Sequence, residues 1–218
     1  MAGELPITLA VEDELSEHIL RSLLIQTKRN FYIGAVYGKK GFGFLKQKLP
    51  AFNNAAKSSS YLLLTDLDNH NCVPALIEDW FRCQLSEYPK RRHTNLIFRV
   101  AVREVEAWVM ADRERFADFL GVSKSLIPDQ LDTVPDPKKL LLQIAAKSRN
   151  RDLRNDIVPR PGDKRKIGPD YNGRLGEFVQ SSWRADVAYA HSSSLARTWK
   201  ILGAFHPIFK KTKSKSVC

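Results

Sequence analysis

Residues 61–70 read YLLLTDLDNH, an apolar run that ends in two carboxylates, Asp66 and Asp68, one residue apart. An uninterrupted apolar run of this length predicts a central strand of a parallel sheet, covered on both faces. Ligands of open α/β sheets bind beyond the carboxyl ends of the strands, and residues two apart on a strand point to the same side. The stretch therefore predicts a site for Mg²⁺ or Mn²⁺, although aspartates after a strand also form turns and helix caps.

The segments around this stretch alternate between strand and helix patterns. Further apolar strands are predicted at 7–11, 31–36 and 96–102, and helical periodicity at 15–26, 44–56 and 74–85. Such alternation predicts an α/β fold with a parallel four-stranded sheet flanked by helices. Later prolines and shorter helical patterns predict a C-terminal helical extension packed on the core. The expected organisation is an α/β core at 1–112, the extension at 113–209 and a basic disordered tail at 210–218.

The predicted first strand runs directly into three acids, Glu12, Asp13 and Glu14. Carboxylates suit the positive end of a helix dipole, and Asp13 and Glu14 suffice for that purpose. Glu12 lies one step earlier, at the tip of the strand. If this strand lies beside 61–66, Glu12 faces the same crevice, where a third carboxylate would complete a metal or proton-transfer site.

A further acidic cluster follows the predicted fourth strand, in residues 103–112. This segment is predicted to be a helix that starts at the same rim of the sheet. Glu104 and Glu106 are two residues apart, so at most one of them faces the crevice. Arg103 and Glu106 are at helical spacing and are placed to pair. Glu106 is the predicted contributor to the site.

The charge of the chain points to a polyanionic partner. The net charge of +11 and the isoelectric point near 9.7 favour nucleic acid. Residues 37–43 form a glycine-rich basic loop without the Gly-Lys-Ser/Thr ending of a Walker A loop, and 149–173 reads as a basic loop. No helix-turn-helix or RNP pattern supports sequence-specific recognition. The predicted nucleic-acid contacts, each with an ion-paired surface residue as its alternative, are Lys39, Lys40, Arg103, Arg151, Arg154, Lys164 and Arg165.

Several classes of protein are excluded or disfavoured by composition. With 43% hydrophobic and 27% charged residues the chain is an ordinary globular protein. The sequence has no segment apolar enough for a membrane span and no secretory signal, so we expect a cytoplasmic protein without a membrane partner. The spacing of His70, Cys72, Cys83 and His93 does not match the close pairs of a structural zinc site.

Two of these motifs together resemble a known family. Val11-Glu12 at the tip of the first strand and Asp66-Leu67-Asp68 after the third are similar to the Toprim domain of topoisomerases, primases and overcoming-lysogenization-defect nucleases. The resemblance implies that Glu12, Asp66 and Asp68 bind Mg²⁺. The glycine that usually follows the strand-one glutamate is Asp13 here, which either joins or distorts the site.

A more particular resemblance covers most of the chain. Residues 41–43 before the 52–56 helix, 103–108, 137–140 and 192–195 resemble small stand-alone Toprim-like proteins encoded beside ATPase genes in defence regions. The resemblance implies a Mg²⁺- or Mn²⁺-dependent nuclease in antiviral defence, acting on DNA or RNA, transfer RNA included, with an ATPase partner. Glu12, Asp66, Asp68 and Glu106 would be its catalytic residues, Glu12 as ligand or general base.

Two alternatives remain open from the sequence. The first is an inactive or weakly active module that serves as a regulatory, nucleic-acid-binding subunit of an ATPase complex. The second is a phosphatase with Asp66 as nucleophile, in the manner of haloacid-dehalogenase-like enzymes. Those enzymes carry Asp-x-Asp on their first strand, whereas it follows the third strand here. The substrate and the oligomeric state, a homo-oligomer included, are left open.

Overall fold

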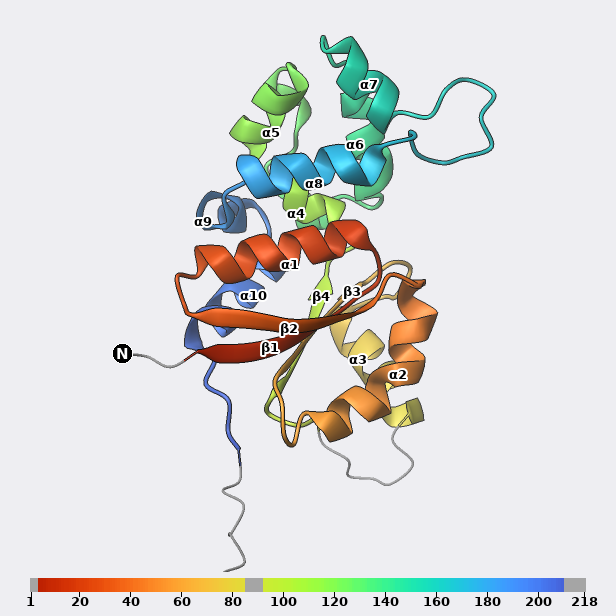
Figure 1. Cartoon of the computed structure of the whole chain (residues 1–218). Coiled ribbons are helices and arrows are strands. Elements are labelled where there is room, and N and C mark those ends of the chain that lie inside the picture. The colour runs from red at the N-terminus through yellow and green to blue at the C-terminus, as the bar shows by residue number, and fades with distance from the viewer. Residues whose placement is uncertain (1–3, 85–91, 210–218) are drawn as a thin grey trace, which may run out of the picture.

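The computed structural model describes residues 4–84 and 92–209 (Figure 1). The predicted tail at 210–218 lies outside these residues. The strands are β1 (Leu5–Val11), β2 (Phe31–Gly38), β3 (Tyr61–Asp66) and β4 (Leu96–Ala101). The helices are α1 (Glu14–Gln26), α2 (Gly41–Ala55), α3 (Val73–Gln84), α4 (Glu106–Ala111), α5 (Arg113–Leu120), α6 (Pro137–Ala145), α7 (Arg151–Ile157), α8 (Tyr171–Ser181), α9 (Ala185–Ala188) and α10 (Ser193–Ala204).

Within the described residues the strands form one parallel sheet in the order β2-β1-β3-β4. The predicted α/β fold with four parallel strands is therefore confirmed. The register pairs Val11 of β1 with Leu64 of β3, and Asp66 of β3 with Ala101 of β4. The carboxyl ends of β1, β3 and β4 consequently lie at one rim of the sheet, where Glu12 follows β1 and Asp66 ends β3.

The sheet is covered on both faces, as the apolar run at 61–64 predicts. Alternate residues of β3 serve two separate clusters. Leu62 and Leu64 pack with α1 and the C-terminal helices, and Leu63 packs with α2 and α3. Figure 1 shows α1 on one side of the sheet and α2 and α3 on the other. The predicted extension also joins the first cluster, because α8 packs along α1 and α10 lies against β4.

Two predicted helix starts are wrong. The helix α2 begins at Gly41, so the glycine-rich loop before it is shorter than expected, and it continues through Pro50. The helix expected over 103–112 begins only at Glu106 and breaks at Asp112, whose buried carboxylate accepts the Arg184 amide at 2.8 Å. A tertiary contact thus fixes a break that periodicity cannot reveal.

The basic segment expected to be a loop contains the helix α7. Asn150 caps it by accepting hydrogen bonds from the Asp152 and Leu153 amides. Leu153 and Ile157, four residues apart, are both buried and give the helix its packed face. No helix in the described residues has the length and apolarity that a membrane span requires.

One glycine fixes how β2 meets the tip of β1. Gly38 has φ +121°, and a Cβ built on it would lie 1.8 Å from the carbonyl oxygen of Val11. Immediately beyond, the Lys39 amide donates to the Val11 carbonyl at 3.0 Å and the Gly41 amide to the Glu12 carbonyl at 3.1 Å. The backbone at Glu12 is therefore held by the end of β2, and this depends on a residue without a side chain at position 38.

Replacing Gly38 by alanine is expected to destabilise the protein by about 2 kcal/mol or more, because the new methyl group collides with backbone and the φ is unfavourable. Gly34→Ala in the same strand is the matched control, since its Cβ would meet nothing within 4 Å. Urea unfolding of both variants measures the difference. Equal midpoints for the two variants would show that the close approach at Gly38 is unimportant.

Candidate metal centre

Glu12 and Asp66, which are far apart in sequence, meet at the rim of the sheet. The Glu12 Oε1 atom accepts a hydrogen bond from the Asp66 amide at 3.0 Å and another from the Thr65 hydroxyl. Both contacts form because β1 and β3 are neighbouring strands and Val11, the residue before Glu12, is paired with Leu64. The carboxylate that the sequence places at the tip of β1 therefore reaches across to the tip of β3.

The carboxyl group of Asp66 faces the next strand of the sheet. Its Oδ1 atom accepts the Val105 amide at 3.0 Å, just before α4 begins. Burial raises the pKa of Asp66 well above its usual value, and the nearby charges of Glu106 and Glu12 raise it further. Asp66 thus lies at the centre of a group of acids that repel one another.

The pKa of Glu12 is also displaced, from 4.5 to about 7. Burial is the main cause, and the hydrogen bonds from Thr65 and from the Asp66 amide oppose it without cancelling it. The charges of Asp68 and Asp13 raise the pKa further. Glu12 therefore exchanges its proton near neutral pH.

Asp68 lies close to the other acids, but not for the predicted reason. The strand β3 ends at Asp66, and Asp68 is an exposed turn residue with φ +47°, a left-handed conformation that aspartate tolerates. Its amide donates to the Arg103 carbonyl at 2.9 Å, and Arg103 Nη1 donates to its carbonyl at 3.0 Å. A backbone turn, rather than strand alternation, sets the position of Asp68.

Glu106 is 1% exposed and belongs to a buried network. Its Oε1 atom accepts the Tyr171 hydroxyl at 2.9 Å and lies 3.2 Å from Lys138 Nζ, while its Oε2 atom is buried without a hydrogen-bond partner. The predicted pairing of Glu106 with Arg103 is wrong, because Arg103 donates to the carbonyls of Asp68 and His70 instead.

Lys138 and Tyr171 are residues of this site that the sequence did not reveal. They come from α6 and α8, and no spacing in the sequence links them to 103–106. Burial lowers the pKa of Lys138, but the charges of Glu106 and Glu104 outweigh burial and leave it raised. Glu104 is partly buried and accepts the Lys138 amide at 2.8 Å. Lys138 is therefore a cation held between two carboxylates.

Asp13 performs the capping role that the sequence offered as its simplest explanation. Its Oδ1 atom accepts the Ser16 amide at 2.8 Å at the start of α1. Its charge nevertheless raises the pKa values of Glu12, Asp66 and Glu106. Asp13 thus adds negative charge to the site, while its Oδ1 atom caps α1.

The basic residues predicted for nucleic acid have different surroundings. Lys39 forms an ion pair with Glu17 of α1 at 2.7 Å, and Lys40 is exposed with its Nζ atom 5.6 Å from the centre of the Phe44 ring. Arg103 supports the turn at Asp68. Of these three residues, Lys40 is the one placed to contact a ligand without first giving up a partner.

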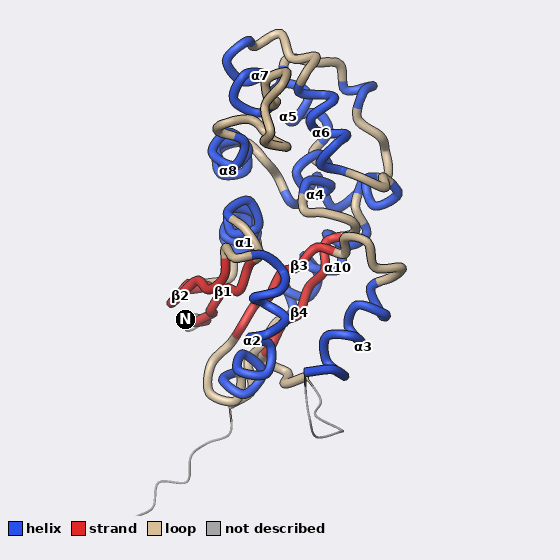
Figure 2. The backbone as a smooth tube through the Cα atoms, turned by 90° about the vertical axis from the view of Figure 1, so that its right-hand side faces the viewer, coloured by secondary structure: helices blue, strands red, loops and turns tan. Residues whose placement is uncertain are grey.

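The remaining four lie in or after α7. Arg154 donates to the Ser148 carbonyl at 2.8 Å, and Arg165 pairs with Asp163 at 2.6 Å. Arg151 and Lys164 are exposed. Figures 1 and 2 show α7 at the end of the molecule formed by α5–α8, apart from α2, so these residues and Lys40 do not form one compact patch.

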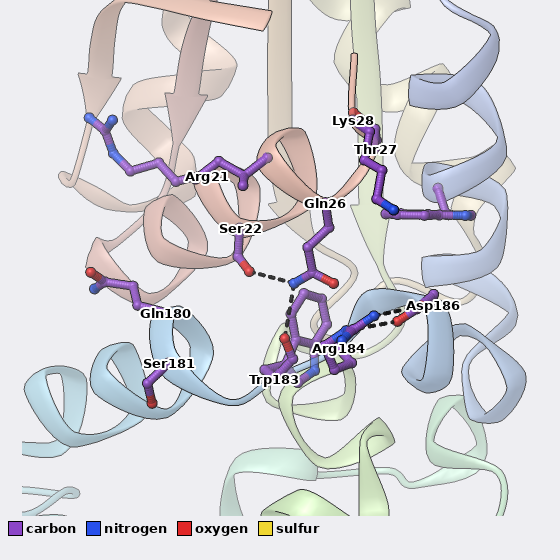
Figure 3. A pocket seen from close by; sticks show the side chains of 12 residues that line it. Arg21, Ser22, Gln26, Thr27, Lys28, Gln180, Ser181, Trp183, Arg184 and Asp186 are labelled. Carbon is purple, nitrogen blue, oxygen red and sulfur yellow. Dashed lines mark hydrogen bonds and ion pairs between the residues drawn. The ribbon is translucent and has the colours of Figure 1, made fainter. Parts of the chain in front are cut away.

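A groove of about 920 Å³ lies elsewhere, between the C-terminal end of α1 and the α8–α9 region (Figure 3). Gln26 donates to Ser22 one turn earlier in α1 and, across the groove, to the Trp183 carbonyl, and Asp186 is paired with Arg184 at 3.0 Å. Glu12 and Asp13, which belong to the acidic site, lie at the other end of α1, about 18 Å away for a helix of this length. The groove is therefore separate from the acidic site.

The side chains at the rim fit a divalent cation in their chemistry but do not enclose one in their present positions. Within residues 4–84 and 92–209, no three side chains of the ligating types stand close enough to enclose an ion as they are placed. The chemistry of the donors does fit, since carboxylate oxygens suit Mg²⁺ and Mn²⁺. Burial, with a smaller contribution from neighbouring acidic charges, raises the pKa values of Glu12 and Asp66, so a bound cation would stabilise their ionised forms.

Comparisons with known proteins give one structural likeness. No family model and no curated protein matches the chain. Among solved structures it is similar to the C-terminal region of the Burkholderia pseudomallei OLD protein, with a TM-score of 0.44 and 11% identity over 90% of this chain and 96% of that one. At these values the likeness carries no argument about chemistry, which rests on the side chains described above.

The raised pKa of Glu12 predicts a pH-dependent stability. Since the folded pKa of about 7 exceeds the ordinary 4.5, the unfolded chain loses the proton first, and stability falls as the pH rises from 4.5 to 7. Glu12→Gln keeps the acceptor oxygen and removes the charge. In EDTA it should be more stable than wild type by about 1–2 kcal/mol at pH 8, with little difference at pH 4.5. Wild-type stability that does not vary over this range would contradict the assignment.

Removing the cation beside Glu106 should be costly. Lys138→Met leaves a buried carboxylate without its counter-charge, which typically costs about 3 kcal/mol or more. The loss should shrink as the pH falls and Glu106 takes up a proton. Adding Glu106→Gln to Lys138→Met should restore most of the stability, as measured by chemical unfolding. A double variant as unstable as Lys138→Met would show that the charge pair is not the cause.

Proposed function

We propose that this chain is a divalent-metal-dependent nuclease that hydrolyses phosphodiester bonds in DNA or RNA. The observation that carries the proposal is the contact of Glu12 with the tip of β3 at Asp66. It gathers acids from separate segments at the carboxyl rim of a parallel sheet, where such folds bind their ligands. A protein with a net charge of +11 that concentrates acids at one point is suited to a polyanionic substrate bridged by a cation.

Glu12, Asp66 and Asp68 are the residues that would hold Mg²⁺ or Mn²⁺. When bound, such an ion polarises a phosphoryl oxygen and stabilises charge on the leaving oxygen. Asp68 is exposed in its turn, so its side chain can rotate toward the other two carboxylates without disturbing a buried contact. The Val105 amide orients Asp66, and Thr65 and the Asp66 amide orient Glu12.

Glu12 is also suited to proton transfer. A pKa of about 7 gives a group that accepts and releases a proton at neutral pH, as a general base requires. Thr65 and the Asp66 amide donate hydrogen bonds to its Oε1 atom, which leaves Oε2 to accept a proton or bind an ion. Glu106 takes a different role in our proposal, because a side chain that is 1% exposed positions Lys138 and Tyr171 rather than touching a polynucleotide.

The exposed basic residues would contact the substrate through its phosphates. Lys40 lies at the start of α2, and Arg151 and Lys164 lie on the outer helical region. Backbone contacts of this kind give salt-dependent affinity without sequence preference. The defence role and the ATPase partner rest on the sequence resemblance alone and are part of the proposal.

A second candidate is a regulatory subunit of an ATPase complex that binds nucleic acid without cleaving it. The observation in its favour is the state of Glu12. Its Oε1 atom is engaged by two protein donors, and its pKa leaves it partly protonated at neutral pH. Both properties reduce its affinity for a cation until another charge or ligand arrives.

Cleavage assays with Asp66→Asn separate the two candidates. Supercoiled DNA, messenger-like RNA and transfer RNA are incubated with wild-type protein in Mg²⁺, Mn²⁺ or EDTA. The nuclease proposal predicts cleavage that requires the ion and falls about 100-fold or more in Asp66→Asn, because several kcal/mol of transition-state stabilisation are lost. Asp118→Asn, an exposed carboxylate on α5, is the control and should cleave normally.

Two results would decide against catalysis. Equal cleavage by wild type and Asp66→Asn would show that any activity comes from elsewhere. Binding of a labelled oligonucleotide without cleavage in either ion, with or without an ATPase, would favour the regulatory subunit.

A further inference from the structure

A cluster of three arginines lies outside the acidic site, on the edge strand β4. Arg99 projects from the face of β4 that α10 covers, and its Nε atom donates to Thr198 Oγ1 at 3.0 Å. Thr198 is fully buried and donates in turn to the Ser194 carbonyl at 3.0 Å. One edge of the Arg99 guanidinium is therefore fixed by the fold.

The other edge of that guanidinium has nothing to bind. Within the described residues neither Nη atom of Arg99 has a hydrogen-bond acceptor, and neither is sealed from solvent. Other arginines of the protein behave differently: Arg21, Arg113 and Arg174 each contact a carboxylate at the surface. A half-buried arginine with a fixed inner edge and an open outer edge is arranged to receive an anion.

Two further arginines lie near enough to Arg99 for their charges to act on it. Arg197 is exposed on α10, next to Thr198, and Arg92 leads into β4. The pKa of Arg99 is lowered to about 10, mainly by burial and in smaller part by the positive charges of Arg92 and Arg197. No ion pair joins any of the three to a carboxylate in residues 4–84 and 92–209. The fold thus brings three like charges together without neutralising them, at a cost in stability.

We propose that Arg92, Arg99 and Arg197 form a phosphate-binding site at the β4 edge of the sheet. Guanidinium groups present parallel N–H donors that match two oxygens of a phosphate, and the three positive charges outweigh the two negative charges of a phosphate dianion. Phosphate is favoured over a single carboxylate because a phosphate dianion, or two successive phosphodiesters of a nucleic-acid backbone, brings two negative charges to the cluster. No carboxylate of the rim is among the charges that act on Arg99, so this site is distinct from the acidic one.

The described part of the C-terminal segment passes close to the start of β4. The Asn95 side chain exchanges two hydrogen bonds with the Ile208 backbone, at 2.9 and 2.8 Å, just before β4 begins. The phosphate comes either from a nucleic-acid backbone or from a free phosphate compound, and the test below distinguishes the two.

The test uses the full-length protein in EDTA, so that cleavage does not interfere. Inorganic phosphate and pyrophosphate are titrated against sodium chloride at equal ionic strength, with the thermal midpoint as readout, and a labelled single-stranded oligonucleotide is titrated by anisotropy. Arg99→Met and Arg197→Met are compared with Arg82→Met, an exposed arginine on α3 that is paired with Glu78. Arg197 is exposed, so its substitution keeps the test valid if Arg99→Met fails to fold.

We expect Arg197→Met to weaken binding of the phosphate-bearing ligand about tenfold, the effect of losing one charge-assisted contact, and Arg82→Met to leave it unchanged. Loss with all probes supports a general phosphate site. Loss with the oligonucleotide alone identifies the backbone as the source, and loss with phosphate and pyrophosphate alone identifies a free compound. If Arg197→Met binds every probe as tightly as wild type does, the proposal is overturned. This outcome does not depend on the result of the nuclease assay.

Discussion

The hydrogen bond from the Asp66 amide to Glu12 is the contact on which the candidate site depends. It joins the tips of β1 and β3, and Asp66 continues the connection to the Val105 amide at the entrance to α4. The bond forms because a parallel sheet places the carboxyl ends of its strands at one rim. Gly38 secures the arrangement from the other side, since only a residue without Cβ lets β2 approach Val11 so closely.

The acids that this contact brings together make the rim electrostatically unfavourable. Burial and mutual repulsion raise the pKa values of Glu12, Asp66 and Glu106, and Lys138 is the cation that the fold brings into the group. Sites that collect like charges against their stability are commonly functional. Near β4, Arg92, Arg99 and Arg197 form a corresponding group of unneutralised positive charges. The protein therefore keeps an acidic centre and a basic one apart.

The sequence predicts most of the sheet and little of the surroundings of the site. The run at 61–66 identifies a central strand because apolar residues on both faces have no other environment, and Glu12 follows from the end of its neighbour. Asp68 was placed on a strand that in fact ends at Asp66. Helical spacing predicts that Glu106 pairs with its sequence neighbour Arg103. Its actual partners, Lys138 and Tyr171, lie in helices dozens of residues later in the chain. Periodicity describes local structure and cannot report such tertiary contacts.

The most direct test is a crystal of the protein soaked in Mn²⁺, with anomalous diffraction measured near the manganese edge. The account predicts a peak between Glu12 and Asp66, with carboxylate oxygens at about 2.1–2.3 Å and Asp68 turned toward the ion. Density for the three carboxylates without an anomalous peak, at Mn²⁺ concentrations that saturate ordinary magnesium sites, would contradict it.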